Sequence, residues 1–201
     1  QNPEWIRQMV GVKPRNGHHL HFIAFELGRS PDGQWWVLND RTQAPAGAGF
    51  ALENRVATKR IYNDLYAKAN VLRLSGFFRV FRDRLLQMRP DGRGNVAILT
   101  PGTHTTTYYE HVYIARYLGL MLVEGEDIVI ERGQPMVRTV SGSQPVSVLW
   151  RRVDAQFADP LELKESSLIG VPGLVGAVRQ QSVDLINALG SGVLETRAFL
   201  A

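Results

Sequence analysis

The chain has 201 residues, of which 44% are hydrophobic and 21% charged, a composition typical of a globular protein with one large domain or two small ones. It contains no cysteine, which excludes a disulfide scaffold and a thiol nucleophile, and no apolar run reaches the ~20 residues of a membrane-spanning helix. The formal net charge is +4, but the arginines are dispersed among acidic residues, so we expect anions bound at single points and no nucleic-acid partner.

The first part of the chain predicts a β-hairpin followed by two helices. Strand-like runs at 19–27 and 34–38 flank a Pro-Asp-Gly turn, and a loop of small residues follows at 42–49. Helices are expected at 51–66 and at 76–88. In the second of these, Phe77, Phe78, Phe81, Leu85 and Met88 recur at spacings of one to four residues, mostly three or four. We expect these phenylalanines, together with Trp35 and Trp36, to lie in the core or to cover the hairpin.

The second part alternates strands and helices after a turn-rich linker at 89–94. Strands are expected at 95–100, 120–124, 127–131, 136–140, 146–152 and 183–187, with helices at 107–118 and over most of 163–180. This alternation predicts an α/β fold with a parallel, doubly wound sheet.

Ligands of such sheets bind beyond the carboxyl ends of the strands. Three strand ends here lead into small or polar segments, at 100–107, 151–159 and 187–192. If they converge, they form a polar crevice. The alternative is that these segments are polar only because they are loops. Glu110 and His111 at a helix start suit acid–base chemistry, although ordinary helix-terminal residues explain them as well.

Several stretches resemble the circularly permuted, type 2 ATP-grasp family, relatives of glutathionylspermidine synthase. The resemblance rests on 35–55 (WWVLNDRTQAPAGAGFALENR), 108–119 (YYEHVYIARYLG), 150–154 (WRRVD), 170–174 (GVPGL) and 187–195 (NALGSGVLE). It implies the central segment of a longer protein. It further implies a partial ATP-grasp-like segment with a β-hairpin at 1–90 and a Rossmann-like, substrate-side (pre-ATP-grasp) domain at 95–201.

The family's chemistry is ATP-dependent, peptide-bond-forming ligation of a carboxylate to an amine, with Mg²⁺. In active relatives an Asp on the first hairpin strand and a Glu-Asp-Asn run on the second hold the cofactors. These positions fall here on Glu26, Asn39 and Arg41, so only Glu26 keeps a metal-binding carboxylate and Arg41 places a cation at the Mg²⁺ position. The erosion leaves two hypotheses: a ligase fragment that is inactive when isolated, or a degenerate module that binds a ligand or partner without catalysis.

The resemblance also implies a small-molecule or peptide-like substrate with a carboxylate, and a partner in the rest of the same polypeptide. We expect a cytoplasmic protein. The substrate-binding residues predicted from the three strand ends are Tyr109, Glu110, His111, Arg151, Arg152, Asp154, Asp159, Asn187 and Ser191.

Overall fold

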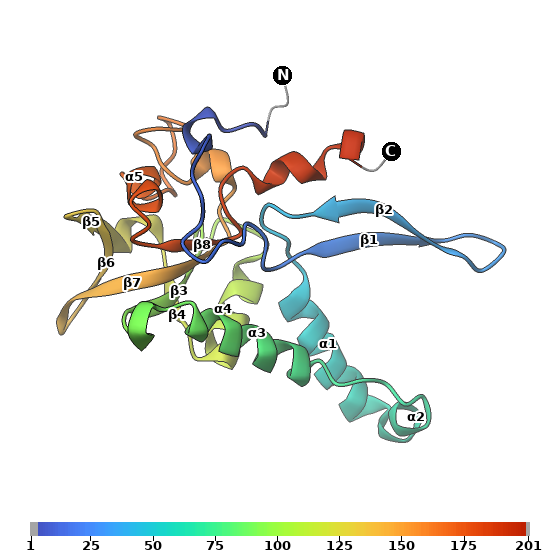
Figure 1. Cartoon of the computed structure of the whole chain (residues 1–201). Coiled ribbons are helices and arrows are strands. Elements are labelled where there is room, and N and C mark those ends of the chain that lie inside the picture. Colours follow the sequence, from blue (N-terminus) through green and yellow to red (C-terminus); the bar gives the residue numbers. More distant parts are fainter. Residues whose placement is uncertain (1–3, 200–201) are drawn as a thin grey trace.

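A two-stranded hairpin and a six-stranded mixed sheet with helices on both faces make up the computed structural model, which describes residues 4–199 (Figure 1). The strands are β1 (Ala24–Arg29), β2 (Trp35–Arg41), β3 (Asn95–Leu99), β4 (Met121–Val123), β5 (Ile128–Glu131), β6 (Gln134–Thr139), β7 (Gly142–Arg151) and β8 (Asp184–Ile186). The helices are α1 (Ala48–Ile61), α2 (Asn63–Lys68), α3 (Ser75–Gln87), α4 (Tyr108–Leu118) and α5 (Leu174–Arg179). Within the described part of the chain, no helix combines the length and the apolar character needed to cross a membrane.

The predicted hairpin is confirmed, with antiparallel pairing from Ala24 opposite Arg41 to Arg29 opposite Trp35. It projects from the body of the molecule (Figure 1), and no further strand pairs with it among residues 4–199. Trp35 and Trp36 lie on β2 of this hairpin with side chains 66% and 60% exposed, so neither is a core residue. On α3, Phe78 and Phe81 are buried as expected, whereas Phe77 is 53% exposed.

The six-stranded sheet confirms the α/β class and corrects the expected strand directions. Strands β4, β3, β7 and β8 pair in parallel, which is the Rossmann-like portion, whereas β5, β6 and β7 pair antiparallel. The connections from β5 to β6 and from β6 to β7 are two residues long, too short for the crossover that a parallel pair requires. The first half of β7 therefore pairs with β6, and its second half lies between β3 and β8.

Alternate residues of the strands face two apolar layers. Ala97 and Leu99 of β3 face the layer that contains α5, whereas Val96 and Ile98 face the layer that contains α3 and α4. Helix α3 thus shares a core with strands of the second half of the chain. The division into 1–90 and 95–201 stays a prediction, and this core extends across its boundary.

Two helix predictions are corrected. The helix expected at 51–66 is interrupted at Tyr62, which separates α1 from α2. Of the helix expected over 163–180, only α5 forms. The preceding residues make turns in which Gly170 lies against the backbone: a Cβ there would be 2.2 Å from the carbonyl oxygen of Phe157. The N–H of Val171 donates to the carbonyl of Ala158 at 2.9 Å, whereas a regular helix would direct it to residue 167.

Candidate functional site

Two adjoining clefts lie at the carboxyl ends of β3 and β7. The strand-end cleft, of about 540 Å³, is lined by the loop after β3, including residues 104–107, and by residues that follow β7. The hairpin-side cleft, of about 560 Å³, is lined by the base of the hairpin, residues 43–46, Asp154 and Glu195. Ala44, Ala46 and Asp154 line both clefts. The expected convergence of 100–107 with 151–159 is thus confirmed, at the place where α/β sheets bind ligands.

The buried carboxylate of Glu110 anchors the chain just after Ala44 and Ala46, which line both clefts. It accepts hydrogen bonds from the backbone N–H groups of Gly47 at 2.8 Å and Gly49 at 3.3 Å, at the first turn of α1. Gly49 has no space for a larger residue, since a Cβ there would be 2.6 Å from Cγ of Glu110. A protein carboxylate therefore occupies the amino-terminal end of α1, where an anionic ligand would otherwise bind.

Arg152, directly after β7, contacts both this segment and Glu110, and it also lines the strand-end cleft. Its Nη1 donates to the carbonyl of Pro45 at 2.7 Å, and its Nη2 lies 3.8 Å from Oε1 of Glu110. Burial lowers the pKa of Arg152, and the Glu110 carboxylate opposes that change. Arg152 lines the strand-end cleft and is 9% exposed. It therefore places a largely desolvated cation beside the cleft.

His111 lines the same cleft from the first turn of α4 and is 2% exposed. Its Nδ1 lies 2.8 Å from the Thr100 hydroxyl, which also accepts the N–H of Gly102 at 3.2 Å. Burial lowers the pKa of His111 to about 4, and the nearby charge of Arg152 contributes. The imidazole is therefore neutral at pH 7.

This environment predicts a pH-dependent stability. Because the pKa of His111 is about 4 in the folded state and 6.5 ordinarily, the unfolded chain binds the proton first as the pH falls. The free energy of unfolding should decrease between pH 6.5 and 4, by an amount on the order of a few kcal/mol. Arg152 is the buried charge that acts on the ring, with Glu110 3.8 Å from that guanidinium, and Asp154 and His104 line the same cleft.

Urea denaturation at several pH values checks this expectation, with His111→Gln as the comparison. In the variant, the free energy of unfolding should depend much less on pH between pH 6.5 and 4. A residual slope is expected from His21, because burial lowers the pKa of that residue as well. An unchanged slope in His111→Gln would contradict the assignment.

The third predicted strand end, at 187–192, does not line the strand-end cleft. Arg151, which is fully buried, donates to the carbonyls of Asn187, Val153 and Ala188 and to the Ser191 hydroxyl. Asn187 donates to the carbonyls of Phe22 and Thr42 and accepts the N–H groups of His21 and Phe22. The Ser191 hydroxyl donates to Thr42. These three polar side chains join segments of the chain, and their contact with a substrate stays a prediction.

The side chains of two other predicted substrate residues also lie away from the strand-end cleft. The buried carboxylate of Asp159 accepts N–H groups of Leu161, Gly173 and Val175, which orders the turns before α5. Tyr109 is 54% exposed and stacks on Phe50, with a ring-centroid distance of 5.9 Å. Of the nine predicted residues, His111, Arg152 and Asp154 line this cleft.

At the hairpin, the residues that resemblance assigned to ATP and Mg²⁺ do not form a metal site. The Nε of Arg41 donates to Oε1 of Glu26 at 2.8 Å, and its Nη2 binds the same oxygen. Both side chains are about half exposed and line the hairpin-side cleft. Asn39 does not line this cleft, and its Oδ1 accepts the N–H of Asp40. Among residues 4–199, no group of three histidine, aspartate or glutamate side chains is placed to hold a metal ion. The guanidinium of Arg41 is hydrogen-bonded to the Glu26 carboxylate, the oxygen ligand that Mg²⁺ would require here.

Sequence reasoning missed the residues that shape the hairpin-side cleft. Oε1 of Glu195 accepts the N–H groups of Thr42 at 2.7 Å and Gln43 at 2.5 Å, and Oε1 of Gln43 accepts the N–H of Ala155 at 2.7 Å. All of them lie in stretches quoted for the resemblance or directly beside one. Nothing in their spacing indicates that 42–43, 155 and 195 meet.

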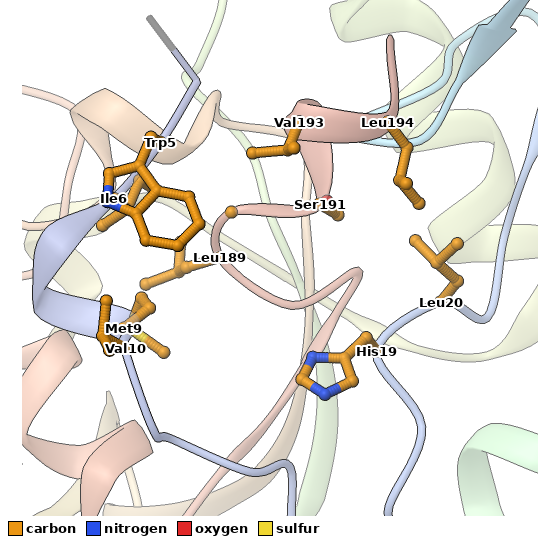
Figure 2. A pocket seen from close by; sticks show the side chains of 11 residues that line it. Trp5, Ile6, Met9, Val10, His19, Leu20, Leu189, Ser191, Val193 and Leu194 are labelled. Atoms are coloured by element: carbon orange, nitrogen blue, oxygen red, sulfur yellow. The ribbon is translucent and has the colours of Figure 1, made fainter. Parts of the chain in front are cut away.

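A third hollow, the N-terminal groove, has a volume of about 320 Å³ and a different character (Figure 2). Figure 2 shows Trp5, Met9 and Leu189 on one side of it, with His19 and Leu194 opposite. Its side chains are apolar except His19 and Ser191. The groove is therefore mainly apolar and offers a charged substrate group only two polar side chains among the described residues.

Comparisons with known proteins agree with the resemblance. The family model of the circularly permuted ATP-grasp type 2 proteins matches residues 1–201. An uncharacterized protein of Synechocystis is 35% identical over 199 residues, which cover 98% of this chain and 41% of the relative. Two uncharacterized proteins of Mycobacterium tuberculosis are each 36% identical; the matches cover 93% and 99% of this chain but 34% and 23% of those relatives.

The chain thus spans less than half of the length of these curated relatives. The match of the family model over the whole length agrees with the fold, a hairpin and helices beside a mixed α/β sheet. The chain belongs to the circularly permuted ATP-grasp type 2 family.

Proposed function

We propose that this chain supplies the acid-binding portion of an ATP-dependent carboxylate–amine ligase-like protein. The observation that carries the proposal is the strand-end cleft, where His111 and Arg152 meet the loop after β3. Its position at the carboxyl ends of parallel strands favours a small ligand, and its polar lining favours a charged or strongly polar group on that ligand.

The remaining parts of such an enzyme belong, in this proposal, to the rest of a longer polypeptide. Support comes from the relatives, which extend well beyond the matched region. The hairpin gives further support, since Trp35, Trp36 and Leu38 remain exposed on a sheet of two strands. An isolated two-stranded sheet is at best marginally stable, so a further layer is expected to cover it.

ATP and Mg²⁺ are the cofactors that the family implies. In this chain the ion pair between Arg41 and Glu26 does not fit a metal ion, so we assign no Mg²⁺ ligand within residues 4–199. In a ligase, the metal ligands would have to come from the rest of the polypeptide.

The same ion pair favours a second candidate function. If Arg41 closes the nucleotide site in the complete protein as well, the chain is a degenerate module that binds a peptide-like or acidic ligand without catalysis. The strand-end cleft would serve either function, so nucleotide binding is the property that distinguishes the two candidates.

Calorimetric titration of Mg·ATP into the full-length protein separates them, with the double variant Asn39→Glu/Arg41→Asn for comparison. The ligase proposal predicts that the unaltered protein binds Mg·ATP. Binding that appears only in the double variant would contradict the ligase function and support the degenerate module. A full-length protein that binds Mg·ATP with micromolar affinity would exclude the degenerate module.

A further inference from the structure

The hydrogen bond between Thr100 and His111 fixes which ring nitrogen carries the proton. Thr100 is 1% exposed, and its oxygen already accepts the N–H of Gly102. Within residues 4–199 its O–H has one acceptor, Nδ1 of His111 at 2.8 Å. If Nδ1 carried the proton instead, a buried hydroxyl would be left without an acceptor, at a cost of about 1–3 kcal/mol. Thr100 therefore donates, and the proton of the neutral ring resides on Nε2.

The protonated Nε2 has no hydrogen-bond partner among residues 4–199. No hydrogen bond to it forms among the described residues, and it is not among the fully buried side-chain atoms that lack a partner. Since the ring lines the strand-end cleft, Nε2–H is open to that cleft. A polar group on a side chain that is 98% buried is thus presented to a ligand rather than used by the fold.

A second set of donors lies at the same place. The backbone N–H groups of Tyr109 and Glu110, in the first turn of α4, make no hydrogen bond with the described part of the chain. N–H groups of a first helical turn point toward the helix start, here residues 105–107, which line the cleft. The helix dipole also favours negative charge at this end of α4.

Arg152 makes the electrostatic potential positive at the His111 ring. The lowering of the His111 pKa by Arg152 reflects a positive potential at the ring. The Glu110 carboxylate, 3.8 Å from Arg152, offsets part of that charge but points to the start of α1. Asp154 is exposed at the opening shared with the hairpin-side cleft. The interior therefore suits one oxyanion of modest affinity.

We propose that the strand-end cleft binds an oxyanion, a carboxylate or phosphate group, on the Nε2–H of neutral His111 and the free N–H groups that begin α4. His111 is then a donor and not a general base, because its outward nitrogen already carries the proton. A carboxylate is the group that the proposed function requires here, and the inference rests on that proposal only for this choice of ligand.

The tautomer is tested on the unaltered chain, so the result does not depend on any variant folding. A long-range ¹H–¹⁵N correlation spectrum distinguishes a protonated ring nitrogen from an unprotonated one. At pH 7, His111 should show a protonated Nε2 and an unprotonated Nδ1. A protonated Nδ1 with an unprotonated Nε2, or an imidazolium, would overturn the inference. Thr100→Val, which removes the hydroxyl, should shift the ring toward a mixture of tautomers.

Binding is tested by titrating acetate and inorganic phosphate separately into the same chain. His111→Leu should weaken the binding of the preferred anion about tenfold or more, the loss of one hydrogen bond to a charged group. His111→Gln, which keeps an N–H donor, should stay within a few-fold of the unaltered chain. His19→Leu, the control histidine substitution in the N-terminal groove, should leave the affinity for both anions unchanged.

The outcomes separate this inference from the proposed function. If the chain binds acetate more tightly than phosphate, the result supports both the oxyanion site and the proposed acid-binding function. Tighter binding of phosphate, weakened by His111→Leu, supports the oxyanion site but contradicts an acid-binding cleft. Equal binding by His111→Leu and the unaltered chain, or no binding of either anion, overturns the inference, whereas Mg·ATP binding by the full-length protein is decided separately.

Discussion

Replacing Asn187 with aspartate is expected to lower the free energy of unfolding by about 3 kcal/mol or more. The amide Nδ2 donates to the carbonyl oxygens of Phe22 at 2.7 Å and Thr42 at 2.5 Å, and the side chain is 2% exposed. Aspartate has nearly the same shape, but it would place a buried carboxylate oxygen against two carbonyl oxygens. Urea denaturation followed by circular dichroism measures the loss.

Asn95→Asp is the matched control for this substitution. The Asn95 amide also donates twice, to Gln144 and Pro145 at 3.2 and 3.1 Å, but it is only partly buried. Water can solvate the new carboxylate there, so the expected loss is about 1 kcal/mol or less. Similar losses at the two positions would show that Asn187 does not connect the N-terminal segment, the 42–49 loop and the end of β8 as described.

Gly170→Ala is expected to cost about 3 kcal/mol for a different reason. A Cβ at this position would lie 2.2 Å from the carbonyl oxygen of Phe157 and 2.8 Å from the carbonyl carbon of Ala158. Both are backbone atoms in a buried region, so a side-chain rotation cannot relieve the clash, and the loss falls at the upper end of the range for overpacking. Urea denaturation measures this loss too.

Gly176→Ala, six residues along the chain, provides the control. Gly176 lies inside α5, and nothing is within 4 Å of a Cβ built there. Alanine should therefore raise the free energy of unfolding by about 0.5–1 kcal/mol, as in the interior of other helices. If both alanines destabilise equally, the close approach at Gly170 is not the cause.

The local pattern of the sequence predicted most of the elements correctly. The apolar run at 95–100 and the helical period at 76–88 correspond to β3 and α3. The helical period also indicates which face of α4 is buried, since His111, Ile114, Ala115 and Leu118 share it whereas Tyr109 lies outside. The failure over 163–180 arose because Gly170 and the Asp159 contacts depend on segments that are distant in sequence.

The candidate site was less predictable than the fold. The sequence pattern places Arg151 and Arg152 at the end of a strand, but does not indicate that the first binds backbone carbonyls while the second lines a cleft. A polar residue at a strand end can serve a ligand or the loops themselves, and only the tertiary arrangement decides between them. The Arg41–Glu26 pair is similar: the sequence indicates a cation near a carboxylate, and the structure shows that the two are bonded.

The central claim is that the strand-end cleft, and not the hairpin, is the ligand site built by this chain. A single NMR titration of the ¹⁵N-labelled chain, first with Mg²⁺ and then with acetate, tests it most directly. We predict that Mg²⁺ leaves the amide signals of Glu26, Asn39 and Arg41 unchanged, and that acetate moves those of residues 102–111. Saturable Mg²⁺ shifts at Glu26, or acetate shifts that avoid residues 102–111, would contradict the account.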